Sequence, residues 1–175
     1  MTIRILGLDP GGTTGWALFS AEERYEHDDK AVVYDKPKFT CGELGAGDKH
    51  EHHNELYELM ELQQSDNYII VCESFEYRNT ARAGLELISK EYIGVVKLFA
   101  QQRMLGLSSQ RLVFQTASMG KITQKSFVKK RNLQKLGLWY STDGNHAMDG
   151  YGHLLFWMIH YGNVMKQELL LKGWK

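Results

Sequence analysis

Proline and cysteine are both scarce in this sequence, with two of each in 175 residues. Because prolines are so few, helices and strands are rarely interrupted. Together with an apolar content of 43%, this favours one compact, well-ordered domain that spans residues 1–175. Cys41 and Cys72 have neither the spacing of metal ligands nor the number of a disulfide framework. We therefore expect a protein of a reducing cytosol.

Long apolar runs and a signal sequence are also missing. The longest apolar stretch near the C-terminus, residues 154–159, is far shorter than the roughly 20 residues of a membrane-spanning helix. The N-terminus has no basic segment followed by an apolar core, which is the pattern of a signal peptide. We expect no membrane contact.

Net charge is zero, yet basic and acidic residues are unevenly spread. Residues 111–142 hold seven basic residues and no acidic one, whereas residues 1–110 hold eleven basic and eighteen acidic residues. A neutral protein with one strongly positive segment can bind a polyanion there. The same composition also suits a solvated helix face, and the charges alone do not separate the two.

A buried strand that ends on a carboxylate opens the chain. Residues 3–8 form a short apolar run, followed by Asp9 and a turn that contains Gly11, Gly12 and Gly15. Glycines leave room for a phosphate to approach, and a carboxylate beside them suits a magnesium ion that carries one. A plain hairpin in which Asp9 caps the turn would have the same pattern.

A second strand has the same ending. Residues 67–73 contain an apolar run without alternation, which is typical of a strand buried on both faces, and the run stops at Glu73. A carboxylate at the end of a buried strand is costly unless it is paired or bound to a cation. Two strands with this ending are more informative than either alone.

The remaining elements follow from periodicity. We expect strands at residues 16–19, 39–44 and 111–115, a short strand at 32–34, and helices at 55–64, 80–102 and 145–167. His50, His52 and His53 have no partner Cys or His at a zinc-like spacing, so we expect an exposed lead-in to the first helix.

The start of the last helix carries a His-x-x-Asp pattern. His146, Asp149 and His153 are spaced by three and four residues and therefore share one helix face. Alone, such a pattern is also typical of a helix cap or a surface pair.

These residues together resemble the RuvC-like Holliday junction resolvases of the RNase H-like nuclease superfamily. The resemblance is carried by Gly7-Leu8-Asp9-Pro10-Gly11, by Glu73, by His146-Ala147-Met148-Asp149 and by Lys125-Ser126-Phe127-Val128. It implies an α/β, RNase H-like fold: a five-stranded mixed sheet with helices on both faces. The family often has an aromatic residue three positions after the glutamate, where this chain has Glu76 between Phe75 and Tyr77.

The resemblance also implies an activity, a metal-dependent cleavage of branched DNA. Two magnesium ions, with manganese as a substitute, would be held by Asp9, Glu73 and Asp149. His146 would be a further ligand or the base that deprotonates water, and His153 would lie behind the site or in the core. DNA contacts would come from Phe75, Tyr77, Lys121, Lys125, Lys129, Lys130 and Arg131.

Four-way junctions, and also flaps or forks, are the implied partners, in a bacterial or phage-infected cell or an organelle. A four-way junction has approximate two-fold symmetry, so we expect a homodimer, with the helix at residues 80–102 as its contact. Two other functions fit parts of the sequence. The glycine turn resembles that of actin-like phosphotransferases that bind ATP, and an RNase H-like DNA-binding protein without activity would look similar.

Overall fold

A computed structural model describes residues 1–25, 32–45, 49–65, 67–74, 83–103, 111–120, 134 and 146–162 of the chain. The strands are β1 (Thr2–Asp9), β2 (Thr14–Tyr25), β3 (Val32–Leu44), β4 (Asn67–Glu73) and β5 (Leu112–Gln115). The helices treated below are α1 (Lys49–Leu62), α2 (Ala83–Arg103) and α5 (His146–His160).

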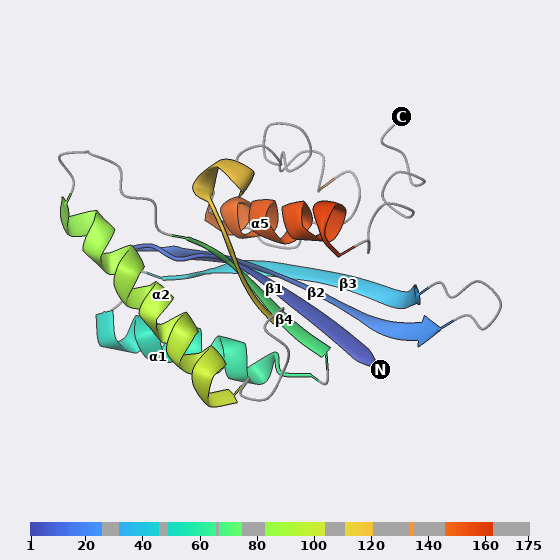
Figure 1. Ribbon diagram of the computed structural model, residues 1–175. Helices are drawn as coiled ribbons and strands as arrows, with labels where there is room; N and C mark the ends of the chain where they lie inside the picture. The colour runs from blue at the N-terminus through green and yellow to red at the C-terminus, as the bar shows by residue number, and fades with distance from the viewer. Residues whose placement is uncertain are drawn as a thin grey trace.

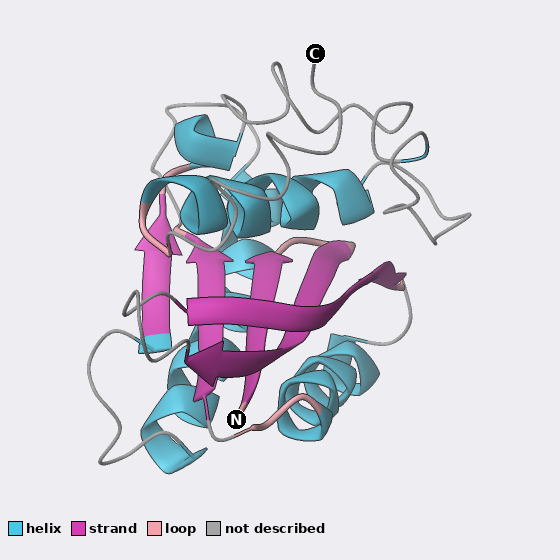
Figure 2. Ribbon diagram, turned by 90° about the vertical axis from the view of Figure 1, so that its right-hand side faces the viewer, coloured by secondary structure: helices cyan, strands magenta, loops and turns pink. Residues whose placement is uncertain are grey.

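The five strands form one mixed sheet in the order β3-β2-β1-β4-β5. β1 and β2 are antiparallel, as are β2 and β3, whereas β4 runs parallel to both β1 and β5. Figure 2 shows helices on both sides of these strands. The predicted five-stranded mixed sheet with helices on both faces is confirmed, as is the prediction that the first, fourth and fifth strands are neighbours.

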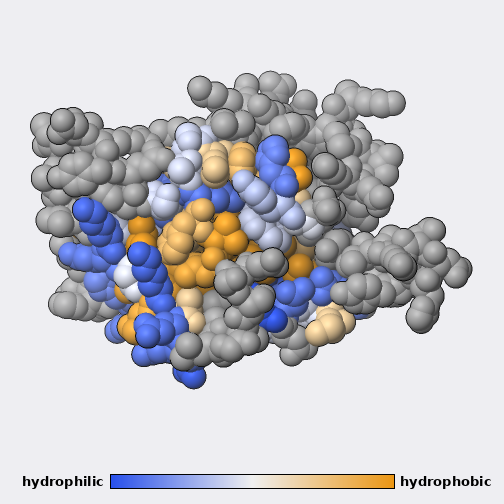
Figure 3. All heavy atoms as spheres, in the orientation of Figure 1, coloured by the Kyte–Doolittle hydropathy of each residue, from blue (hydrophilic) through white to orange (hydrophobic). Residues whose placement is uncertain are grey.

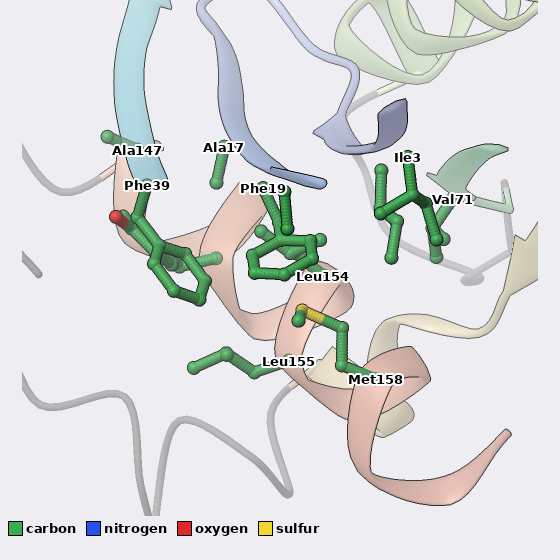
Figure 4. Close-up of a cluster of buried hydrophobic side chains, with 12 residues drawn as sticks. Ile3, Ala17, Phe19, Phe39, Val71, Ala147, Leu154, Leu155 and Met158 are labelled. Carbon is green, nitrogen blue, oxygen red and sulfur yellow. The ribbon is translucent and has the colours of Figure 1, made fainter. Parts of the chain in front are cut away.

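Each face of the sheet has its own core. On one face α5 covers β1, β2 and β3, and Phe19, Phe39 and Leu154 belong to the cluster of buried side chains between them (Figures 1 and 4). On the other face α1 and α2 cover the sheet, where Leu8 and Tyr92 belong to a second buried cluster. Alternate residues of β1 point to the two cores, which explains why Ile3 and Ile5 on one face and Leu6 and Leu8 on the other are all apolar.

The hairpin of β2 and β3 is longer than the sequence predicted. Separate strands at 16–19, 32–34 and 39–44 were expected, but β2 continues to Tyr25 and β3 is a single strand from Val32 to Leu44. Polar residues that follow the predicted strand at 16–19, such as Glu22 and Glu23, pair in register with β3. An antiparallel pair can carry polar side chains on a solvated face, so charge did not end these strands.

His52 and His53, two of the three histidines before the first predicted helix, are not an exposed lead-in, and the side chain of His50 lies outside the described part of the chain. α1 already begins at Lys49, and His52 is only 2% exposed. The Nε2 atom of His52 lies 3.1 Å from Thr14 Oγ1, and its ring packs on Tyr92 with 4.4 Å between centroids. His53 is half-buried, and its ring also packs on Tyr92. The prediction was wrong because these polar rings find partners on other elements.

The two long helices differ from the prediction mainly at their ends. α5 stops at His160, where the Tyr161 and Gly162 N–H groups both donate to Trp157 O, so the predicted end at residue 167 was wrong. α2 ends at Arg103, one residue after the predicted end, and residues 80–82 of the predicted helix lie outside the described part of the chain. Its side chains Tyr92, Val96 and Phe99 are buried in the core. None of the described helices is both long and apolar enough to cross a membrane.

The outer surface of α2 is largely hydrophilic, with Leu98 as an exposed apolar residue. Figure 3 shows hydrophilic residues over α2 and hydrophobic residues beside them, over β5. Leu98 of α2 and Phe114 of the edge strand β5 are exposed, and Lys97 Nζ lies 5.4 Å from the centre of the Phe114 ring. α2 therefore packs beside this edge of the sheet while leaving part of its apolar surface in contact with water.

Candidate active site

Three parallel strands end side by side, and each ends on a side chain that can bind or orient a cation. β1 ends at Asp9, β4 at Glu73 and β5 at Gln115. Leu8 pairs with Cys72, and Glu73 pairs with Gln115, so the three ends lie at one edge of the sheet. Parallel strands with matched ends bring residues that are far apart in sequence to one place.

The backbone of α5 lies very close to the backbones of β1 and β2, because glycines line the contact. A Cβ atom on Gly7 would lie 2.5 Å from Gly150 O, and a Cβ on Gly150 would lie 2.7 Å from Trp16 Cα. A Cβ on Gly15 would overlap the carbonyl of His146. The backbones of helix and sheet therefore touch, and α5 is held at a fixed height above β1 and β2.

The first turn of α5 is held in place by a side chain from β3. His146 N donates to Glu43 Oε1 over 2.7 Å, and Ala147 N donates to the same atom over 3.1 Å. The first N–H groups of a helix have no partner within it, and a carboxylate there also interacts favourably with the helix dipole. Glu43 thus fixes the position of the His-x-x-Asp turn.

His153 joins the helix to the strand ends. Its Nε2 atom lies 2.9 Å from Glu73 Oε2, and its Nδ1 atom lies 2.9 Å from Gln115 Oε1. One ligand atom each of Asp9, Glu73 and His153 lie within 4.8 Å of one another. Gly120 packs against the imidazole, since a Cβ there would lie 2.8 Å from His153 Nε2.

The site combines a buried side and an open side. The His153 side chain is 2% exposed, whereas that of Glu73 is 28% exposed and Asp9 is half-buried. Burial, together with the negative charges of Asp9 and Glu73, raises the pKa of the Cys72 thiol well above its usual value. The negative charges of Asp9 and Glu73 thus act on Cys72 as well, and a cation bound at these strand ends would neutralise them.

The donor atoms fit a divalent ion. Carboxylate oxygens suit magnesium and manganese, and an imidazole nitrogen suits manganese and later transition metals better than magnesium. A group of two carboxylates and one imidazole within 4.8 Å can therefore bind such an ion.

Only part of the predicted site lies in this group. Asp9 and Glu73 lie at the strand ends as expected. Asp149 is half-buried and His146 is exposed in the first turn of α5, and neither belongs to the group of three. The predicted DNA-contacting residues lie outside the described part of the chain: Phe75, Tyr77, Lys121, Lys125, Lys129, Lys130 and Arg131.

Two residues have a larger part in the site than the sequence suggested. His153 was expected behind the site or in the core, and its spacing from Asp149 was the available signal. Gln115 was not singled out, although it ends the third parallel strand in the same way as Glu73 ends the second. A neutral amide at a strand end does not stand out in a sequence as a carboxylate does.

Comparisons with known proteins bear on the fold. No protein-family model and no curated protein matches the sequence. Two solved structures of Thermus thermophilus RuvC are similar to the chain, one of them described as "in complex with Holliday junction substrate". The TM-scores are 0.57 for that complex and 0.55 for the other structure. Both are 13% identical to the chain, with 90% of this chain and 96% of RuvC covered. The resemblance read from the sequence is therefore confirmed at the level of the fold, which is the RNase H-like fold of RuvC.

Proposed function

We propose that this protein is a metal-dependent endonuclease that cleaves branched DNA, with four-way junctions as its first substrate class and flaps or forks as related ones. The observation that carries the proposal is the meeting of Asp9, Glu73 and His153 within 4.8 Å at the ends of parallel strands. The RuvC-like fold supports it, because a RuvC structure with this fold is described in complex with Holliday junction substrate.

Asp9 and Glu73 hold divalent ions in this proposal, and Asp149 adds a third carboxylate from α5. Magnesium is the expected metal, and manganese can replace it because both ions accept carboxylate oxygens. Paired divalent ions supply a nucleophile from water at neutral pH and stabilise the leaving oxygen of a phosphodiester.

The chain itself supplies position and proton transfer. The sheet brings Asp9 and Glu73 together, and the tight glycine contacts fix α5 above them. His146 is exposed at the start of α5, so its imidazole can reach a water molecule or a bound ion. Histidine changes protonation near neutral pH and is suited to remove a proton from that water.

DNA binding and dimerisation complete the proposal. The basic residues Lys121, Lys125, Lys129, Lys130 and Arg131 bind phosphates, and Phe75 or Tyr77 contacts the branch point. A homodimer presents two sites to a two-fold symmetric junction, as two opposed nicks require. A contact through α2 would cover the exposed side chains of Leu98 and of Phe114 on β5.

Cleavage of labelled DNA tests the proposal. The panel contains a four-way junction, a flap, a fork, a plain duplex and an RNA–DNA hybrid, each with magnesium and then with manganese. Asp9→Asn, Glu73→Gln and Asp149→Asn each remove a negative ligand at nearly constant volume, so we expect loss of cleavage with folding and DNA binding retained. Glu58→Gln is the matched control, because Glu58 is an exposed carboxylate of α1 and does not belong to the group of Asp9, Glu73 and His153.

The outcomes separate the functions. Cleavage of branched DNA by the control, and none by the three site variants, supports the proposal. Near wild-type cleavage by Glu73→Gln contradicts the metal assignment. DNA binding without cleavage of any substrate, with either metal, points to an inactive DNA-binding protein instead.

A further inference from the structure

We propose that His153 is a direct metal ligand, binding through Nε2 the same ion as Asp9 and Glu73. This inference rests on the proposed metal-dependent function and assigns to the site a nitrogen donor beyond the His146–Asp149 turn. His153 lies one turn further along α5 than Asp149, on the side of the helix that faces β4 and β5.

The first argument is the spacing of the donor atoms. His153 Nε2 and Glu73 Oε2 are 2.9 Å apart, and a carboxylate oxygen of Asp9 lies within 4.8 Å of both. Two ligands at right angles around an octahedral ion, each about 2.1 Å from it, lie roughly 3.0 Å apart. The observed pair therefore already has the separation of adjacent ligands.

The second argument is the hydrogen bonding of the imidazole. Gln115 Oε1 is an acceptor, so the Nδ1–H of His153 must donate to it. In a neutral ring the other nitrogen, Nε2, then carries a lone pair and no hydrogen. This lone pair faces Glu73 Oε2, which is also an acceptor, over 2.9 Å, so no hydrogen lies between the two atoms. A cation bound by both atoms resolves this conflict. A ring protonated on both nitrogens, or rotation of the Gln115 amide, also resolves it, because the Nε2–H of His153 then donates to Glu73.

The third argument is the support of the ring. A histidine that binds a metal usually donates its other N–H to a carbonyl or carboxylate, which fixes the tautomer and orientation of the ring. Gln115 provides that acceptor and is itself buried, and Gly120 closes against the ring. Gln115 thus holds the ring at Nδ1, while Gly120 packs beside its Nε2 side, where the Glu73 side chain is 28% exposed.

Electron paramagnetic resonance of bound Mn²⁺ tests the assignment without relying on cleavage. The full-length protein is loaded with less than one equivalent of Mn²⁺, and echo modulation is used to detect a directly bound nitrogen. We expect nitrogen coupling in the wild type, which changes when the protein is made with ¹⁵N-histidine. The coupling persists in His146→Ala, which alters an exposed side chain, and disappears in His153→Gln.

A second variant acts through the support of the ring. Gln115→Met has a similar length but no acceptor for the Nδ1–H of His153, and we expect it to weaken Mn²⁺ binding by about 10- to 100-fold. Because His146→Ala with ¹⁵N labelling leaves His153 intact, the assignment stays testable even if His153→Gln does not fold.

Two results would overturn the inference. One is loss of nitrogen coupling in His146→Ala, which would assign the nitrogen to that residue. The other is Mn²⁺ binding that depends on Asp9 but has no nitrogen coupling in the wild type, which would leave His153 as a hydrogen-bond donor to Glu73. The proposed function fails separately, if Asp9→Asn leaves the affinity for Mn²⁺ unchanged.

Discussion

The contact of α5 with β2 can be tested by adding one methyl group at Gly150. A Cβ there would lie 2.7 Å from Trp16 Cα and 2.9 Å from Gly15 O, both backbone atoms that cannot turn aside. Cβ contacts in real structures essentially never fall below 3.0 Å, so α5 must retreat by at least about 0.3 Å, the step from 2.7 Å to 3.0 Å.

Gly94 in α2 is the matched control. It also lies within a helix, but a Cβ there would have no neighbour within 4 Å. Replacing an interior helix glycine by alanine gains about 0.5–1 kcal/mol of stability at either position. This gain cancels in the comparison of the two variants, and the remaining difference is the cost of overpacking, about 1–3 kcal/mol.

Urea unfolding followed by circular dichroism measures both variants. We expect the midpoint of Gly94→Ala to rise above that of the wild type, and the midpoint of Gly150→Ala to lie below that of Gly94→Ala by the equivalent of about 1–3 kcal/mol. If the protein is the proposed nuclease, Gly150→Ala also lowers cleavage, because a shift of about 1 Å at a site can cost about 100-fold in rate. Equal stability of the two variants would refute the close packing of α5.

Three further predictions concern the cap of α5, the buried histidine and the basic segment. Glu43→Ala removes the acceptor for the first N–H groups of α5 and should cost about 0.5–2 kcal/mol in urea unfolding, whereas Glu43→Gln should cost less; wild-type stability of the alanine variant would contradict this. Burial lowers the pKa of His52, with a smaller lowering effect from the neighbouring His53 and an opposing one from Glu55. The unfolded chain therefore binds this proton more readily, and stability should fall as pH drops below about 6.5, by at most about 1.4 kcal/mol per pH unit. His52→Gln should make stability less dependent on pH in this range. Parallel curves of unfolding free energy against pH for the variant and the wild type would contradict this prediction. Charge reversal at Lys125 and Lys129 should weaken junction binding and reduce the log–log salt slope by roughly 0.9 for each phosphate that is no longer neutralised, and an unchanged slope would move the DNA surface elsewhere.

Local composition was enough to predict the central strands β1 and β4. The apolar runs of β1 and β4 stop at Asp9 and Glu73 in the sequence, and the strands stop at the same residues in the structure. A strand buried on both faces needs an apolar side chain at nearly every position, so its bounds can be read from the sequence alone. The resemblance to RuvC, carried by short motifs in the right order, likewise predicted the fold.

Contacts between side chains on elements far apart in the sequence could not be predicted from composition. His52 can be buried because its ring lies within hydrogen-bond distance of Thr14 and packs on Tyr92. His153 can be buried because its two ring nitrogens lie within hydrogen-bond distance of Glu73 and Gln115. A histidine in a sequence is compatible with water or with a core, and which one applies depends on polar atoms that other strands and helices bring to it. The paired hairpin strands and the membership of His153 in the candidate metal site are of this kind, because they follow from contacts between residues that only the folded chain brings together.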